Sequence, residues 1–248
     1  MVSKKISQIM INEQIADRHI AYDHLFDYIK QYSERVAHNA QLVFIKAIEM
    51  NVYNDYQDLN IKNAKYIFDI VKYFDVGYAF ENGESLYSGT AIPMQHIQLG
   101  AEVFFSDVKK REDYKALSKE ELLIRRLGKE VAYYHHERWD GGGYPEGISG
   151  DDIPLPAQIV ALVSTYCALT ENRSFRKAFS KEEALELMEL VAGVDFNADW
   201  SKEALILMNK QDVILKLEEI ISELERRKEL FRSRMRKNIQ EFNLYDSG

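Results

Sequence analysis

The chain has 248 residues, of which 46% are hydrophobic and 29% charged, so it can bury a substantial core. Its net charge of -8 argues against a general nucleic-acid surface, and we expect no DNA partner. A single cysteine, Cys167, excludes an internal disulfide, and no apolar run is long enough to span a membrane, so we expect a cytoplasmic protein without membrane contacts.

Apolar residues recur every three or four positions through most of the chain, and this spacing predicts an all-α fold. Residues 15–50 are expected to form one or two amphipathic helices, and a further helix is expected at 61–74. The apolar stripe of the first stretch consists of Leu25, Ile29, Val36, Ala40, Val43 and Ala47. Three histidines in this region are expected at the surface or at helix caps rather than as metal ligands: His19, His24 and His38.

Two Ser-Lys-Glu-Glu segments, at residues 118–121 and 180–183, are capping boxes that predict helix starts. The first box opens a helix that ends at His135 and His136, and the second opens a helix through Met188. Between them, a helix is expected at 157–169.

Residues 135–147 read His-His-Glu-Arg-Trp-Asp-Gly-Gly-Gly-Tyr-Pro-Glu-Gly. Two adjacent histidines at a helix end can bind a metal ion, or they can simply interact with the negative end of the helix dipole. The glycine run predicts a turn that few other residues could form. On these residues alone, both interpretations of the histidine pair stay open.

The block around the histidine pair resembles the HD-GYP family, bacterial metal-dependent phosphohydrolases that cleave cyclic di-GMP. The family has a His-His-Glu triplet, a loop ending in Gly-Tyr-Pro, a helix and an Arg-Lys-Ala stretch in this order. Here they correspond to residues 135–137, 143–145, 157–169 and 173–178. The resemblance implies an HD-domain-like helical bundle at 25–208, preceded by a helical segment at 1–24 and followed by a helical tail at 209–248.

The resemblance also implies one metal site that contains a carboxylate and three imidazoles. Such a donor set suits Fe, Mn or Zn. The metal ligands implied are Asp75, which would also be the catalytic carboxylate, His96, His135 and His136.

A second metal position of the family does not match this chain. Where the family has His, His and Asp, the chain has Tyr32, Phe74 and Ser164, and Tyr78 replaces a lysine that lies beside the phosphate in the family. We therefore expect no full two- or three-metal centre, and impaired catalysis. Cys167, on the same helix as Ser164, is expected to be a small core residue rather than a thiolate ligand.

Two groups of residues are implied in binding the nucleotide. The loop retains the family's shape, and the cations that follow can meet phosphate oxygens. Tyr144 can either stack on a base or pack within the loop. The residues implied are Gly143, Tyr144 and Pro145 in the loop, with Arg173, Arg176 and Lys177 after it.

Residues 213–242 carry apolar residues at coiled-coil-like spacing. They could pair two copies into a homodimer or fold back on their own domain, and the sequence favours neither. The second half of this stretch is strongly basic, which we interpret mainly as a solvated face rather than a partner-binding one.

Three functions are compatible with these features. The favoured one is a degenerate HD-GYP-like signalling protein, a pseudoenzyme that binds cyclic di-GMP or a related nucleotide, or docks on a partner such as a diguanylate cyclase, with little or no hydrolysis. The alternative is a phosphodiesterase that acts on cyclic di-GMP or another nucleotide with a reduced metal centre. The third is a structural role for the helical tail.

Overall fold

The computed structural model describes residues 23–49, 64–80, 94–105, 111–173 and 176–208, together with the single positions 210, 226, 229 and 233. The chain forms two compact units, Met1–Leu205 and Ile206–Gly248. Within the described residues there is no β-strand, only isolated bridges between Arg173 and Arg176 and between Ala192 and Phe196. The predicted all-α class is therefore confirmed.

The described part of the chain contains five longer helices and four shorter ones. The longer ones are α3 (Asp23–Glu49), α6 (Gln95–Val103), α8 (Lys119–Tyr134), α9 (Leu155–Leu169) and α10 (Lys181–Leu190). The shorter ones are α4 (Lys65–Val71), η1 (Val76–Phe80), α7 (Arg111–Ala116) and η2 (Gly150–Asp152). A further helical run covers residues 198–208.

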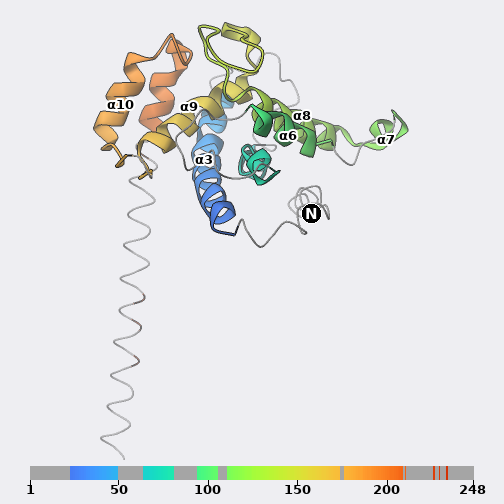
Figure 1. Cartoon of the computed structure of the whole chain (residues 1–248), viewed down its shortest axis with the longest axis horizontal. Coiled ribbons are helices and arrows are strands. Elements are labelled where there is room, and N and C mark those ends of the chain that lie inside the picture. Colours follow the sequence, from blue (N-terminus) through green and yellow to red (C-terminus); the bar gives the residue numbers. More distant parts are fainter. Residues whose placement is uncertain are drawn as a thin grey trace, which may run out of the picture. The chain divides into compact units, whose positions relative to one another are not determined.

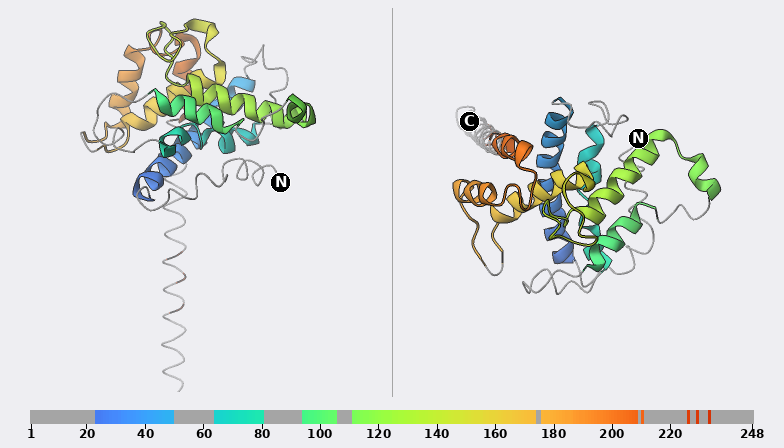
Figure 2. Two further views of the ribbon diagram at one scale, coloured as in Figure 1. Left: turned by 45° about the vertical axis from the view of Figure 1, so that its right-hand side comes forward. Right: turned by 90° about the horizontal axis from the view of Figure 1, so that it is seen from above.

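Helix α9 forms the centre of the first unit. Ten of its fifteen residues are buried, so it is apolar on all sides rather than on one face. It contacts α3, α8 and α10, and Figure 1 shows it lying between α10 and the α6–α8 pair. Figure 2 shows the crossing of α3 and α9 from two further sides. The core of the first unit therefore forms around one largely buried helix.

The predicted stripe of α3 faces this core where its side chains are described. Val36, Ala40 and Val43 are buried, whereas His38 is exposed as expected. Cys167 is a buried free thiol in α9, and Asn39 of α3 donates a hydrogen bond of 3.8 Å to its Sγ. Its predicted place in the core is confirmed.

Both predicted capping boxes are present. The Ser118 hydroxyl accepts a hydrogen bond from the Glu121 N–H, and the Glu121 carboxylate accepts one from the Ser118 N–H. Ser180 and Glu183 do the same at the start of α10. Each pair satisfies two N–H groups that a helix start leaves without intrahelical partners.

Two expectations are not tested by the described residues. The coiled-coil-like contact at 213–242 lies outside the described residues, apart from exposed helical positions 226, 229 and 233. The domain limits at 25 and 208 stay predictions.

Among the described helices, none combines the length and apolar character that crossing a bilayer requires.

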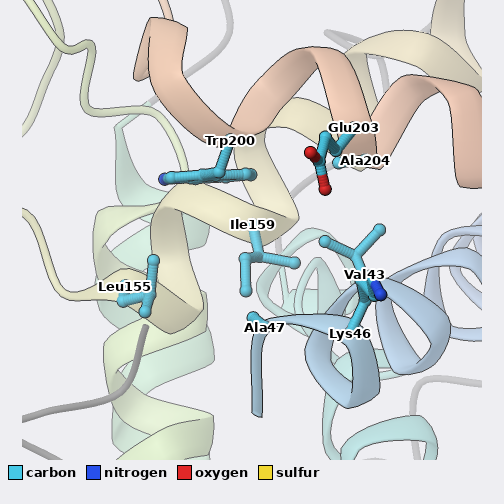
Figure 3. Close-up of a pocket in the computed structure, with 8 residues that line it drawn as sticks. All are labelled: Val43, Lys46, Ala47, Leu155, Ile159, Trp200, Glu203 and Ala204. Carbon is cyan, nitrogen blue, oxygen red and sulfur yellow. The ribbon is translucent and has the colours of Figure 1, made fainter. Parts of the chain in front are cut away.

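A small apolar pocket opens between α3, α9 and residues 200–204. Figure 3 shows Trp200 lying across it, with Ile159 and Val43 below. Its volume of about 20 Å³ is room for a water molecule and far too little for a nucleotide. This pocket therefore cannot be a nucleotide-binding site.

Candidate metal centre

Four side chains from three parts of the first unit meet at one point, and we call them the His/Asp cluster. Their ligand atoms all lie within 4.8 Å of one another. Three members are buried and the fourth is half-buried. The cluster consists of Asp75, in the turn after α4, His96 on α6, and His135 and His136 directly after α8. The sequence-based proposal named these same residues.

Gly77 lets the turn that carries Asp75 lie directly on α6. A Cβ atom at this position would stand 1.8 Å from the backbone oxygen of His96, which no side chain can tolerate. The absence of a side chain at Gly77 therefore allows Asp75 and His96 to approach one another.

The distances within the His/Asp cluster match neighbouring ligands of one ion. Asp75 Oδ1 lies 3.3 Å from His135 Nε2 and 3.9 Å from His96 Nε2, and the Nε2 atoms of His96 and His136 are 3.2 Å apart. Ligand atoms at about 2.0–2.2 Å from a common ion are separated by roughly 3 Å when they are adjacent. The four atoms therefore need little movement to share one ion.

The hydrogen bonds of His135 leave its Nε2 lone pair facing the cluster. Its Nδ1 lies 2.9 Å from the Val131 oxygen and 3.1 Å from the Ala132 oxygen, and carbonyl oxygens can only accept. In the neutral ring, Nδ1 therefore carries the hydrogen, an arrangement typical of metal-binding histidines. Nε2 and the opposing Asp75 Oδ1 are both buried and have no hydrogen-bond partner.

Two electron-rich atoms that face each other in a buried place require a positive charge between them. A divalent ion supplies it, so the residues present fit a metal. A proton on His135 would be the alternative source.

Aromatic rings hold the imidazoles of the His/Asp cluster from outside. Tyr78 stacks on His96 with 4.1 Å between ring centroids and 7° between planes, and Tyr144 stacks on His136 at 4.7 Å and 19°. Phe74 and His135 make an edge-to-face contact with 5.0 Å between ring centroids. Such contacts restrict ring rotation, so the imidazoles are oriented before any ligand binds.

Burial lowers the pKa of His136 well below its ordinary value of 6.5, and the neighbouring His135 and His96 lower it further. A lowered pKa keeps the imidazole neutral at neutral pH, with a lone pair available. The half-buried Tyr144 is affected in the opposite direction, since burial and then the Asp75 carboxylate raise the pKa of its phenol. Tyr144 therefore stays a neutral hydrogen-bond donor.

A second group of side chains lies beside the His/Asp cluster, and we call it the aromatic plug: Tyr32, Phe74 and Ser164. The Tyr32 and Phe74 ring centroids are 6.1 Å apart, and the Tyr32 hydroxyl donates a hydrogen bond of 2.8 Å to the Ser164 backbone oxygen. Burial, and then the nearby Asp75 carboxylate, raise the pKa of Tyr32 well above its ordinary value. These are the three positions that the resemblance to the HD-GYP family matched to His, His and Asp of that family.

The glycine-rich loop folds back over the end of α8. The Tyr144 N–H donates to the His136 oxygen at 3.2 Å, and a Cβ at Gly143 would lie 2.4 Å from the Arg138 nitrogen. The Glu137 carboxylate accepts from the N–H groups of Glu146 and Gly147 at 2.7 and 3.1 Å. No role was predicted for Glu137 from the sequence. Its only signal was an acidic residue directly before a glycine-rich loop, whose free N–H groups need acceptors.

The three basic residues implied in phosphate binding lie in different surroundings. The Arg173 guanidinium lies over the Tyr32 ring at 4.8 Å and 3.6 Å from the Glu171 carboxylate, whereas Lys177 is exposed. Arg176 donates to the oxygens of Ala168 at 2.6 Å and Leu169 at 3.1 Å, at the end of α9. Arg173 thus lies closest to the aromatic plug, while Arg176 caps a helix.

Part of the chain that contains His135, His136 and the loop is similar to a known protein family. Residues 110–199 match the model of a family described as HD domain. The match includes His135, His136 and the loop, and it ends short of Asp75 and His96, which the structure brings to the same point. Residues 110–199 are therefore similar in sequence to an HD domain.

Several curated proteins that resemble parts of this chain are phosphodiesterases. A probable cyclic di-GMP phosphodiesterase of Vibrio cholerae is 42% identical over 88 residues, 33% of this chain and 20% of that protein. The 3'3'-cGAMP-specific phosphodiesterase 2 of the same species is 33% identical over 102 residues, 41% of this chain and 17% of that protein. A cyclic di-GMP phosphodiesterase of Thermotoga maritima is 34% identical over 114 residues, 46% of this chain and 28% of that protein.

Each alignment spans less than a third of the relative's length. The chain is thus similar to a part, and not to the whole, of several cyclic-dinucleotide phosphodiesterases.

Proposed function

We propose that this protein is a metal-dependent phosphodiesterase that cleaves a cyclic dinucleotide with a reduced metal centre. The observation that carries the proposal is the His/Asp cluster, in which a buried carboxylate oxygen and a buried imidazole nitrogen face each other without hydrogen-bond partners. This is the alternative function of the sequence analysis, and an intact cluster favours it over a purely non-catalytic role.

The His/Asp cluster would hold one Fe, Mn or Zn ion through Asp75 Oδ1 and the Nε2 atoms of the three histidines. Bound there, the ion would lower the pKa of a water molecule and offset phosphate charge. Asp75 is the only carboxylate of the cluster, so we assign it the proton of the attacking water. The carbonyls of Val131 and Ala132 keep His135 in the tautomer that this arrangement needs.

Three features of the loop region would bind the substrate. Tyr144 offers one ring face while the other rests on His136, and its neutral phenol can donate to a phosphate oxygen. Gly143 and Pro145 define its position in the loop. Arg173 and Lys177 supply positive charge, and Arg176 supports the end of the helix that leads to them.

The substrate class rests on the relatives, whose names specify cyclic di-GMP and 3'3'-cGAMP. We therefore propose a 3'3'-linked cyclic dinucleotide. Cleavage of one phosphodiester bond by water gives the linear dinucleotide.

We further propose that the centre is reduced to one ion because the aromatic plug occupies the place of a second. The Phe74 ring packs against His135 and against Tyr32, and the Tyr32 hydroxyl donates a hydrogen bond to a backbone oxygen. Neither a phenyl ring nor a buried, neutral phenol is a good ligand for these ions.

The aromatic plug also supports a second candidate function. Without a second ion and without a lysine at position 78, the site could retain a cyclic dinucleotide, or dock a diguanylate cyclase through its loop, with little turnover. The retained loop geometry is the observation that favours this candidate.

The test is anaerobic incubation of the purified chain with cyclic di-GMP or 3'3'-cGAMP and ferrous iron or manganese, with products separated by chromatography. Metal content is measured on the same sample after dialysis. We expect about one ion per chain and a linear dinucleotide that is absent with His135→Ala. Bound metal and bound nucleotide without product would favour the second candidate, and the absence of both metal and product would refute the proposal.

A further inference from the structure

The loop over the His/Asp cluster is held by a side chain that belongs neither to the cluster nor to the loop. Glu137 is buried, with 3% of its surface exposed, and follows the cluster histidines directly. Its Oε1 accepts two hydrogen bonds from consecutive backbone N–H groups, those of Glu146 and Gly147. A carboxylate oxygen that accepts two backbone N–H groups makes charge-assisted bonds, which are stronger than neutral ones.

Glu137 closes the far end of the loop, and other contacts fix the near end. The Trp139 and Asp140 N–H groups donate to the oxygens of Asp195 and Val194, at 3.1 and 2.9 Å. Apart from Glu137, the structure describes no acceptor for the N–H groups of residues 146 and 147. The chain between these two ends contains Tyr144.

We propose that Glu137 is a positioning residue that holds Tyr144 over His136, so that the nucleotide-binding face of the site is assembled without the metal ion. This inference rests on the proposed function, because it assigns Tyr144 to substrate binding. It separates two tasks: the histidines and Asp75 hold the ion, and Glu137 holds the loop. The Glu137 contacts run to loop N–H groups, so its loss should leave the cluster atoms in place.

The experiment uses the full chain and four forms of it: unmutated, Glu137→Ala, Glu137→Gln and Glu130→Ala. Glutamine keeps an acceptor oxygen at the same reach. Glu130 lies on α8 and has Arg126 as an ion-pair partner at 3.9 Å, which makes it a carboxylate control. Hydrogen exchange of residues 143–150, Mn²⁺ affinity by calorimetry, melting temperature, and KM and kcat for cyclic di-GMP are measured on each.

For Glu137→Ala we expect loss of exchange protection at 146 and 147 and a KM about tenfold higher, with kcat and Mn²⁺ affinity within about twofold of the unmutated chain. Glu137→Gln should restore the KM to within about threefold, and Glu130→Ala should change none of these quantities.

Two results would overturn the inference. Unchanged protection and KM in Glu137→Ala would mean that the remaining loop contacts suffice. A joint loss of Mn²⁺ binding, kcat and melting temperature would mean that Glu137 merely stabilises the end of α8. If the unmutated chain neither binds nor cleaves a cyclic dinucleotide, the proposed function fails, and the exchange data alone then decide whether Glu137 holds the loop.

Discussion

The His/Asp cluster and the aromatic plug are neighbours that differ in how their polar atoms are satisfied. In the cluster, Asp75 Oδ1 and His135 Nε2 are buried and lack hydrogen-bond partners. In the plug, the Tyr32 hydroxyl donates to a backbone oxygen, and Phe74 presents no polar atom. Since buried polar groups are normally paired, the cluster can accept a cation between these two atoms, whereas the polar atom of Tyr32 is already paired.

The largest expected effect comes from removing the carboxylate of the cluster. Asp75→Ala should weaken Mn²⁺ binding by more than about 100-fold, because loss of an outer-shell partner alone costs roughly 10- to 100-fold. Calorimetry measures it. Ser164→Ala is the matched control in the plug and should leave Mn²⁺ affinity unchanged, since it keeps the backbone oxygen that Tyr32 uses. Equal losses in both variants would remove the distinction between the two regions.

A side chain at position 77 should separate Asp75 from His96. Gly77→Ala places a Cβ against the backbone of His96, so we expect the unfolding free energy to fall by about 3 kcal/mol and metal binding to be lost. Gly100→Ala, in α6, is the control, because its Cβ would meet its nearest neighbour at an ordinary 3.4 Å. Chemical denaturation compares the two. A stable, metal-binding Gly77→Ala protein would contradict this account of the cluster.

Restoring the family's ligand types in the plug should sharpen the comparison. The variant with Tyr32→His, Phe74→His and Ser164→Asp is expected to bind about two Mn²⁺ ions where the unmutated chain binds one. Without metal it should be less stable, because it buries new polar groups. Metal analysis after dialysis measures the stoichiometry. One ion per chain in a folded variant would mean that the plug is not the place of a second ion.

The smallest effect is expected at Arg176, which touches neither region. Arg176→Ala removes hydrogen bonds to the oxygens of Ala168 and Leu169, and should lower the unfolding free energy by about 2 kcal/mol without changing Mn²⁺ affinity. Lys129→Ala, at an exposed position of α8, controls for loss of a positive charge. A weakened nucleotide affinity with unchanged stability would instead return Arg176 to the binding site.

Local sequence signals predicted the helices well, whereas the prediction of the site residues depended on the resemblance to the HD-GYP family. The capping boxes at Ser118 and Ser180 specify helix starts within four residues, so sequence alone places them. The meeting of Asp75, His96 and the histidine pair joins segments far apart in the chain, which no local pattern encodes. The prediction that these residues meet came from the order of the motifs in the HD-GYP family.

Other features of the site could not be predicted. The stack of Tyr78 on His96 and the capping of α9 by Arg176 depend on how the helices pack. The Glu137 contacts are closer in sequence, but they require the loop to fold back, and a glycine run leaves its path open. At Tyr32 and Phe74 the sequence showed only residues that differ from the ligands of the resembled family. The structure adds that their rings pack together and that the Tyr32 hydroxyl binds a backbone oxygen.

The burial of Cys167 gives this protein a built-in chemical reporter. Cys167 is a fully buried thiol near the end of α9, so it can react with a reagent only when this part of the core becomes exposed. The rate of thiol modification therefore measures the free energy of opening the core. Because the chain has no other cysteine, new cysteines introduced on the loop could carry spectroscopic labels while Cys167 stays unreacted in the folded protein.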